Sequence, residues 1–366
     1  MLRRALSSLC SFAASVTLVA ACTTACNNSG ASTVPQTGGG TSALPSPTPA
    51  PTASPTGTPS ASAGVITEFA SSTLGRFPND ITRGPDGNLW YTESSSTTRG
   101  IGRMTPTGAV AEFDTSGNGF FSSPIGITNG PDGNLWYTDA TDPRIGQVTP
   151  NGVLTFFTAG ISAGSNPSFI AAGPDGNLWF TEPGIQKVGR ITTAGAITEF
   201  ASGNSDVQGI TGGPDGNVWF TDSGGGRIGR ITPSGTVTLF SAGITASLRP
   251  QRITAGPDGN VWFVERKFDG SGGRVGRITP AGTITEFSAG VTDNFLSAIV
   301  AGPDGNLWFT GLNAIGRITP AGAVTEYSNG IHGNPAGSIT AGPDGNLWFP
   351  EASGNGRPGT IGRITP

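Results

Sequence analysis

The stretch Gly256-Pro257-Asp258-Gly259-Asn260-Val261-Trp262-Phe263 decides the fold of this chain, because close copies of it occur seven times. The copies start 40 to 46 residues apart, and together they contain all seven tryptophans of the protein. They begin at Gly84, Gly130, Gly173, Gly213, Gly256, Gly302 and Gly342. A period of this length indicates one structural unit that is stacked repeatedly.

Each unit predicts four short strands. In the fifth unit, residues 252–255 and 261–265 flank the Pro-Asp-Gly turn, whose glycine supplies the positive φ of a tight hairpin. Residues 275–279 and 283–287 flank a second turn, of the form Pro-x-Gly. No run shows the 3.6-residue period of an amphipathic helix. Seven units of four antiparallel strands predict an all-β fold, the seven-bladed β-propeller.

The last unit lacks its fourth strand. The chain ends at Ile361-Gly362-Arg363-Ile364-Thr365-Pro366, and the missing Ile-Thr-Glu-Phe segment occurs near the other end, within residues 65–69. An open propeller would leave unpaired strand edges, which are an aggregation hazard. We therefore expect the N-terminal strand to complete the last blade, in a propeller domain that spans residues 64–366.

The residues before the propeller predict export. Within residues 1–22, Arg3 and Arg4 precede an apolar run that is too short and too polar for a good membrane span. The run ends in Leu-Val-Ala-Ala-Cys22, which resembles a bacterial lipoprotein signal, whose cysteine is lipidated. Residues 23–63 are rich in Ser, Thr, Pro and Gly and predict a disordered tether. We expect a protein of the bacterial cell envelope, anchored through lipid at Cys22; plain secretion is the alternative.

The charge of the chain restricts its partners. The formal net charge is −4 and no basic stripe is visible, which argues against nucleic acid as a partner. The membrane would be contacted only through the lipid anchor. The residues predict no cofactor, and we expect a monomer that binds a small molecule or a protein.

One face of the ring is the better candidate for binding. Both tight turns lie on one face, whereas the loops on the opposite face vary in length and composition, as binding loops usually do. The candidates on this variable face are Phe77, Asp80, Phe120, Phe121, Asp206, Gln208, Arg249, Gln251, Arg252, Phe268, Phe295 and His332. Their aromatic rings either contact a partly apolar ligand or keep water out of the blade seams, and the sequence leaves both readings open.

Two charged series recur with the blades. Six blades end their second strand in an acidic residue: Glu93, Asp139, Glu182, Asp222, Glu265 and Glu351, with Gly311 as the exception. Six carry an arginine in the third strand: Arg103, Arg190, Arg230, Arg277, Arg317 and Arg363, with Gln147 as the exception. A ring of carboxylates could bind a cation, but the recurrence favours pairing or hydrogen bonding within the scaffold.

The phrases Trp-Phe-Thr-Glu, Ile-Gly-Arg-Ile-Thr and Ile-Thr-Glu-Phe, repeated in this order over residues 64–366, resemble the streptogramin (virginiamycin) B lyase family. The resemblance implies a seven-bladed propeller that linearises a cyclic depsipeptide antibiotic by Mg²⁺-dependent elimination. It also implies two catalytic histidines and a glutamate, in Pro-His-x-Ile phrases just before the innermost strand of two late blades.

The implied catalytic residues are missing from this chain. The matching positions hold Asn79, Ile125, Ser168, Gln208, Gln251, Ser297 and Gly337. At the carboxylate position two residues earlier, only Asp206 is acidic, and the neighbouring Gln208 has no basic pKa to offer. The one histidine, His332, lies five residues before the matching position in the last blade, in a Gly/Asn-containing loop where we expect surface exposure. We therefore predict no catalytic residue.

Two functions remain open. The first is a non-catalytic propeller that binds a ligand or protein on its variable face. The second is an enzyme, either a diverged carbon–oxygen lyase or a metal-dependent lactone hydrolase, supported only by acidic side chains such as Asp80, Asp206 and Glu93. Mg²⁺ is expected only under the second hypothesis, and the sequence identifies no metal site. Fold alone does not decide between them.

Overall fold

The computed structural model describes residues 63–71, 77–94, 99–115, 122–203, 206–267, 269, 272–335, 337–352 and 359–366. The predicted signal, nearly all of the predicted tether, and the candidates Cys22, Phe120, Phe121 and Phe268 lie outside these ranges. Within them, no helix is long and apolar enough to cross a membrane.

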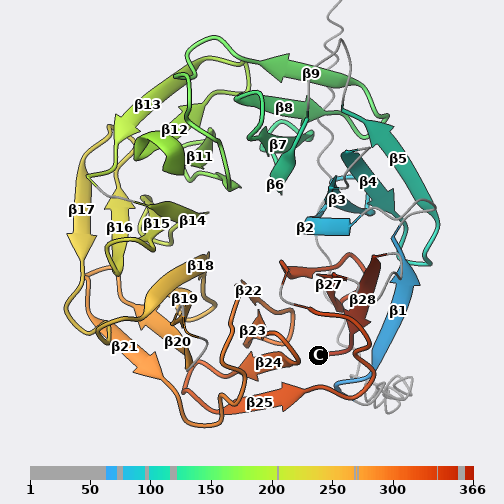
Figure 1. The fold of residues 1–366 in the computed structure, drawn as a ribbon, viewed down its shortest axis with the longest axis vertical. Helices are drawn as coiled ribbons and strands as arrows, with labels where there is room; N and C mark the ends of the chain where they lie inside the picture. Colours follow the sequence, from blue (N-terminus) through green and yellow to red (C-terminus); the bar gives the residue numbers. More distant parts are fainter. Residues whose placement is uncertain are drawn as a thin grey trace, which may run out of the picture. The chain divides into compact units, whose positions relative to one another are not determined.

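Seven four-stranded antiparallel sheets form a ring, which confirms the predicted all-β propeller (Figure 1). The first six blades take their strands in chain order, from the centre of the ring to its rim. Blade 1 consists of β2(Phe77–Arg83), β3(Leu89–Ser94), β4(Gly100–Met104) and β5(Val110–Asp114). Blade 2 consists of β6(Pro124–Asn129), β7(Leu135–Asp139), β8(Arg144–Val148) and β9(Leu154–Phe157). Blade 3 consists of β10(Ile170–Ala172), β11(Leu178–Glu182), β12(Lys187–Ile191) and β13(Ile197–Ala201). Blade 4 consists of β14(Val207–Gly212), β15(Val218–Asp222), β16(Arg227–Ile231) and β17(Val237–Phe240). Blade 5 consists of β18(Arg249–Ala255), β19(Val261–Arg266), β20(Gly273–Ile278) and β21(Ile284–Phe287). Blade 6 consists of β22(Ala298–Ala301), β23(Leu307–Thr310), β24(Ile315–Ile318) and β25(Val324–Tyr327).

Strands from both ends of the chain form blade 7. They are β26(Thr340–Ala341), β27(Leu347–Glu351), β28(Thr360–Ile364) and, on the rim, β1(Ile66–Ala70). Five residue pairs align β1 with β28, from Ile66 opposite Ile364 to Ala70 opposite Thr360. The predicted closure by the N-terminal strand is confirmed. A single 3-10 turn, Pro183–Ile185, is the helical element of the described residues.

The Pro-Asp-Gly turn is held by its own aspartate. In blade 5, Asp258 accepts hydrogen bonds from the Asn260 backbone N–H at 3.2 Å, the Asn260 side chain at 2.8 Å and Trp262 Nε1 at 2.9 Å. Burial alone would raise the pKa of Asp258, but these hydrogen bonds outweigh it and lower the pKa. Gly259 has φ of +75°, which strains other residues.

Each tryptophan joins its own blade to the next one. Trp262 is fully buried, stacks on Phe287 with ring centroids 5.4 Å apart, and packs against Leu307 of blade 6. Arg277 lies over the same indole ring and donates to the carbonyl oxygen of Pro320, also in blade 6, at 3.0 Å. The tryptophans and the third-strand arginines therefore stabilise the scaffold, as the sequence favoured.

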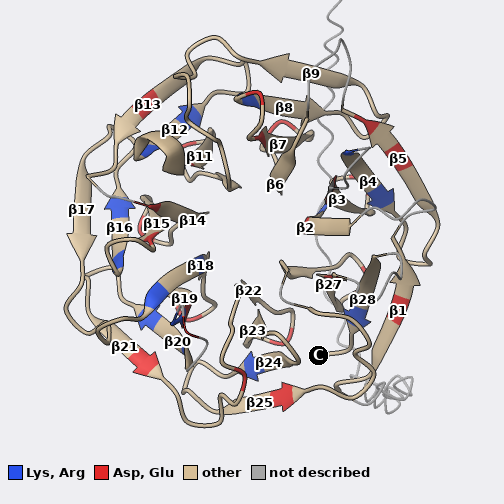
Figure 2. Ribbon diagram, in the orientation of Figure 1, with Lys and Arg blue, Asp and Glu red and all other residues tan. Residues whose placement is uncertain are grey.

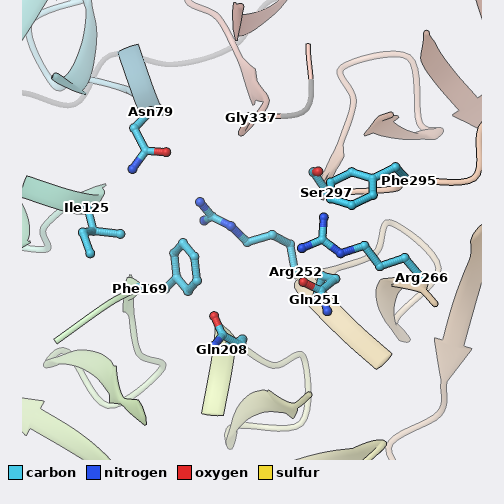
Figure 3. A pocket seen from close by; sticks show the side chains of 10 residues that line it. All are labelled: Asn79, Ile125, Phe169, Gln208, Gln251, Arg252, Arg266, Phe295, Ser297 and Gly337. Atoms are coloured by element: carbon cyan, nitrogen blue, oxygen red, sulfur yellow. The ribbon is translucent and has the colours of Figure 1, made fainter. Parts of the chain in front are cut away.

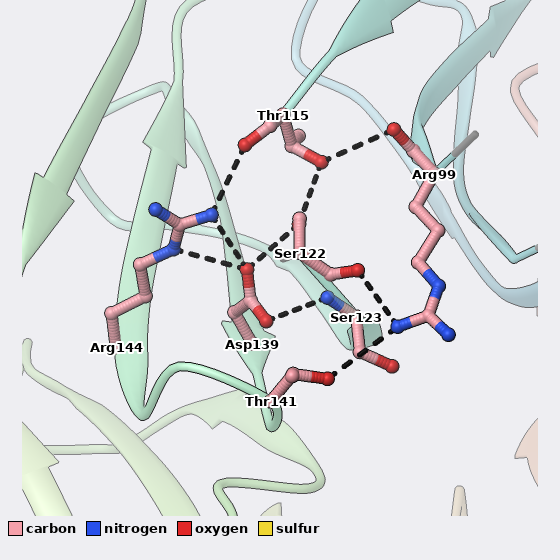
Figure 4. A network of polar contacts seen from close by, with 7 residues as sticks. All are labelled: Arg99, Thr115, Ser122, Ser123, Asp139, Thr141 and Arg144. Atoms are coloured by element: carbon pink, nitrogen blue, oxygen red, sulfur yellow. Dashed lines mark hydrogen bonds and ion pairs between the residues drawn. The ribbon is translucent and has the colours of Figure 1, made fainter. Parts of the chain in front are cut away.

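The acidic residues at the ends of the second strands lie at the opposite end of the blade from those arginines. In blade 2, Asp139 is fully buried and pairs with Arg144 at 2.8 Å (Figure 4). It also accepts from Ser122 Oγ and the Ser123 backbone N–H, both at 2.7 Å. Arg144 donates in turn to the carbonyl oxygen of Thr115, which follows the last strand of blade 1. The cluster ties the two blades together.

Blades that carry glutamate at this position use a second arrangement. Glu182 is fully buried, and its neighbour Glu199, on the outer strand β13, pairs with Lys187 at 2.7 Å. Ser162, in the loop from the preceding blade, donates to Glu199 through both its N–H and its hydroxyl at 2.6 Å. Burial, reinforced by the charge on Glu199, raises the pKa of Glu182 to about 8. Figure 2 shows the acidic bands on the outer strands β1, β5, β13, β21 and β25.

The same position in blade 7 explains the single histidine. Both the backbone N–H and Nδ1 of His332 lie 3.0 Å from Oε1 of Glu68 on β1. His332 thus takes the place that Ser162 holds in the seam before blade 3. In blade 6, where Gly311 replaces the acid, the carboxyl group of Asp293 fills the space, because a Cβ on Gly311 would lie 2.5 Å from Asp293 Cγ.

Candidate functional site

The innermost strands surround a pocket of about 380 Å³ at the centre of the ring (Figure 3). All seven blades contribute to its wall, which mixes amides, guanidinium groups and two phenylalanine rings. The lining residues are Asn79, Ile125, Phe169, Gln208, Gln251, Arg252, Arg266, Phe295, Ser297 and Gly337.

Backbone bulges direct several of these side chains toward the centre. The pairing of the first two strands shifts register between Pro78 and Ile81 in blade 1, and between Pro250 and Ile253 in blade 5. Blades 2 and 4 shift at the corresponding places. A bulge leaves residues of one strand unpaired and re-aims them, as is common beside binding and active sites. The bulged residues include Asn79, Ile125, Gln208 and Gln251, all of which line the pocket.

The pocket contains six of the seven positions that match the catalytic positions implied by the family resemblance. They are Asn79, Ile125, Gln208, Gln251, Ser297 and Gly337. In blade 3 the matching Ser168 is buried, and the next residue, Phe169, lines the pocket instead. The structure therefore brings together the positions that the sequence placed around one centre.

An ion pair crosses the pocket from blade 5 to blade 1. Arg252 Nη2 lies 3.2 Å from Oδ1 of Asp80, and the guanidinium group stacks 3.7 Å from the ring centroid of Phe169 in blade 3. Asp80 is only 4 % exposed and also accepts from the Ile127 backbone N–H at 2.9 Å. These contacts fix Arg252 across the pocket, where Figure 3 shows its side chain extended past Phe169.

A second guanidinium group, that of Arg266, faces the pocket beside the first. It stacks 3.8 Å from the ring centroid of Phe295. Burial lowers the pKa of Arg266 from its ordinary value, because desolvation disfavours the charged form. Among the described residues, no carboxylate forms an ion pair with Arg266.

The two glutamine side chains are held by the scaffold. Gln208 Nε2 donates to Oδ1 of Asp206 at 2.6 Å, and Gln251 Nε2 donates to Ser223 Oγ at 3.0 Å. An amide side chain has two N–H donors and one carbonyl acceptor, so each of these fixed side chains still offers its carbonyl oxygen as an acceptor to a ligand.

The other described candidates lie outside the pocket. Phe77 is 39 % exposed at the start of β2, and Arg249 donates to the carbonyl oxygens of Ser223 and Gly224. The side chain of His332 is 64 % exposed and contacts Glu68 rather than the pocket.

Residue type alone does not identify Phe169 or Arg266 as pocket residues. Phe169 follows Ser168, where two other blades have Gly126 and Gly209, so its bulk at a glycine position is the available signal. Arg266 comes directly after the acidic end of its second strand, and only the longer strand β19 brings it to the pocket.

The donors in the pocket do not suit Mg²⁺. This ion prefers carboxylate and water oxygens in octahedral geometry. Asp80 is already bound by Arg252 at 3.2 Å, and Asp206 accepts a hydrogen bond from Gln208 at 2.6 Å. Among the described residues, no group of three or more His, Cys, Asp or Glu side chains could hold a metal ion. Amides, a hydroxyl and guanidinium groups instead suit the recognition of a polar or anionic ligand.

Comparisons with known proteins agree with this fold. The crystal structure of selenomethionine-substituted virginiamycin B lyase from Staphylococcus aureus is 33 % identical, with a TM-score of 0.72, and the match covers 82 % of this chain and 99 % of that chain. A catalytically inactive histidine-to-alanine variant of that enzyme with quinupristin gives the same values. A streptogramin B lyase structure is 29 % identical, with a TM-score of 0.71, over 83 % of this chain and 100 % of that chain.

A search among curated proteins gave no match. The profile of the virginiamycin B lyase family matches residues 59–267 and 202–366, which together cover the whole propeller. On this match and the 33 % identity over most of both chains, the chain belongs to the virginiamycin B lyase family.

Proposed function

We propose that this protein is an exported, lipid-anchored binding module that holds a small polar ligand in the central pocket and does not linearise streptogramin B antibiotics. One observation carries the proposal: the pocket positions that match the family's catalytic positions hold no side chain able to act as a base near neutral pH.

The chemistry explains why this matters. Elimination from an ester needs a base to remove a proton, and histidine is the usual supplier near neutral pH. Gln208, Gln251 and Ser297 cannot take that proton. Asp80 is engaged with Arg252, and His332 contacts Glu68 at the rim. Loss of a general base typically lowers the rate about 10²–10⁴-fold.

Binding is the role that the remaining side chains support. Arg252 is fixed by Asp80 and Phe169, and Gln208 and Gln251 are fixed through their amide nitrogens. A wall that is already ordered loses little side-chain entropy when a ligand arrives. A pocket of about 380 Å³ accommodates a small molecule.

The test is to incubate the purified full chain with quinupristin and Mg²⁺ and to follow ring opening by mass spectrometry, with the Staphylococcus aureus lyase as the positive control. We expect no turnover above the buffer rate. Metal-dependent turnover would overturn the proposal, and its loss in His332→Ala would identify that residue as the base.

Export and lipid attachment rest on the sequence of residues 1–22 and have their own test. Cys22→Ser should abolish incorporation of a labelled fatty acid and release the protein from the membrane fraction. Unchanged fractionation of this variant would favour another anchor, and a soluble wild-type protein would favour plain secretion.

A further inference from the structure

The lining of the central pocket contains two guanidinium groups and no carboxylate. Of the carboxylates that contact lining residues, Asp206 accepts a hydrogen bond from Gln208 at 2.6 Å and pairs with neither arginine. Asp80 neutralises Arg252 at 3.2 Å. Arg266, which lines the same pocket, is half-buried and forms no ion pair within the described residues. A partly desolvated charge without a counter-charge is unfavourable, and a bound anion relieves this cost.

Other buried or half-buried arginines of the ring differ from Arg266. Arg144, Arg227 and Arg274 each meet a carboxylate within 2.8 Å in the blade seams. The third-strand arginines lie 3.7 to 4.0 Å from the turn aspartates. A carboxylate accompanies these arginines, whereas Arg99 and Arg249 donate to backbone carbonyl oxygens. Arg266 differs from the first group because it lines the pocket without a carboxylate partner among the described residues.

Stacking prepares Arg266 for recognition of an anion. Its guanidinium plane rests 3.8 Å from the ring centroid of Phe295, which restricts the side chain without using its N–H groups. A planar guanidinium fork matches a carboxylate in bidentate geometry. The carbonyl oxygens of Gln208 and Gln251 supply acceptors on the same wall, so they suit hydroxyl or amide donors on the ligand.

We propose that the pocket takes a small organic carboxylate bearing hydroxyl or amide donors, with the carboxylate bound by Arg266. This inference rests on the proposed binding function and names the chemical class of its ligand. Arg252 acts as a positioning residue, because its pairing with Asp80 and stacking on Phe169 fix the wall against which the ligand lies.

The experiment is isothermal titration of the full chain with gluconate, tartrate and N-acetylglycinate, and with sorbitol, the neutral counterpart of gluconate. We expect at least one carboxylate to bind and sorbitol to bind at least about 10-fold more weakly, since charge-assisted bonds are roughly twice as strong as neutral ones. Arg266→Gln should weaken carboxylate binding at least about 10-fold. The affinity of Arg266→Lys should lie between that of Arg266→Gln and that of the wild type.

Arg317→Gln is the matched control, because it removes another half-buried arginine, at the turn end of a blade, and should leave binding unchanged. Equal binding of gluconate and sorbitol, unchanged binding in Arg266→Gln, or no binding of any of the three carboxylates at 100-fold molar excess would each overturn the inference. These failures differ from failure of the proposed function, which is shown by turnover of quinupristin whatever the carboxylates do.

Discussion

At the turn end of the blades, the same contacts recur seven times, whereas at the central pocket nearly every blade presents a different residue. In all seven turns, a tryptophan Nε1 donates to the turn aspartate at 2.9 to 3.0 Å. At the pocket, six blades present an asparagine, an isoleucine, two glutamines, a serine and a glycine at the corresponding position. In blade 3 the serine at that position is buried, and the phenylalanine that follows it lines the pocket. The two regions are under different physical constraints.

The turn aspartates hold tryptophans that are fully buried and pack against the next blade, so a change in any one of them affects the packing of two blades. The pocket side chains face the central cavity, and their replacement disturbs little of the core. A propeller can therefore keep the fold of its family while its pocket chemistry changes, which is the general relation between fold and site. Changes to the closing strand, to one tryptophan, to a buried glutamate and to the histidine should have effects that decrease in this order.

Removal of the closing strand should have the largest effect. Deletion of residues 64–69 removes most of β1 and exposes the edge of β28. We expect the loss of cooperative unfolding and a tendency to aggregate, measured by calorimetry and light scattering. Deletion of residues 40–45, in the predicted tether, is the matched control and should change neither. A truncated chain that melts like the intact one would mean that β1 does not hold the ring closed.

Removal of one tryptophan should cost less than removal of a strand. Trp262→Ala deletes a fully buried ring, its hydrogen bond to Asp258 and its contact with blade 6. We expect the free energy of unfolding to fall by about 3–5 kcal/mol, measured by denaturant titration. Trp262→Phe keeps an aromatic ring and should lose less; an equal loss would show that the ring does not provide the stabilisation.

Stability should fall as the pH rises from about 4.5 to about 8. Burial, then the charge of Glu199, raises the pKa of Glu182 from 4.5 to about 8, so the folded state holds a proton that the unfolded chain has lost. Burial and Glu68 likewise raise the pKa of Glu351 to about 7. Each such group contributes a slope of up to about 1.4 kcal/mol per pH unit in its window.

Glu182→Gln should flatten this pH dependence and stabilise the ring at pH 8, as measured by unfolding at several pH values. The lowered pKa of Glu199 gives the opposite slope only below 4.5, outside the window. A wild-type protein whose stability is level from pH 5 to 8, or a Gln variant with the same slope, would contradict the assignment.

Replacement of the histidine should have the smallest effect. His332→Ser keeps the backbone N–H that donates to Glu68. It also gives the seam before blade 7 a serine, as Ser162 provides in the seam before blade 3. Because the imidazole is largely exposed, we expect a change below about 1 kcal/mol, measured by thermal unfolding at pH 7. A loss of cooperative unfolding in this variant would show that the closing seam depends on the imidazole.

Much of the fold follows from the sequence because it depends on repetition. The spacing of the Trp262-type motifs predicts the blade count, and the orphan segment around Glu68 predicts the closure. The sequence also names Gln208, Gln251 and Arg252 as candidates on the binding face, and all three line the pocket. It does not reveal that Asp80 pairs with Arg252 across the ring, because the two residues lie in blades far apart in the chain.

Other features depend on geometry that no local pattern encodes. Bulges in the innermost strands of blades 1, 2, 4 and 5 direct their residues toward the pocket. Blade 3 has no such shift in register, and there Phe169 lines the pocket while Ser168 is buried. The length of β19 brings Arg266 to the pocket although it begins a variable loop in the sequence. The role of His332 becomes evident only when Glu68, from the other end of the chain, is placed beside it.

The most direct test of the contrast between turn and pocket is the thermal unfolding midpoint of two variants, Asp258→Ala and Gln208→Ala. The first removes an acceptor of three hydrogen bonds in a turn, and the second truncates a side chain that faces the cavity. We predict that Asp258→Ala lowers the midpoint by roughly 2–4 °C or more, whereas Gln208→Ala stays within about 1 °C of the wild type. Equal losses, or a larger loss for Gln208→Ala, would contradict the account.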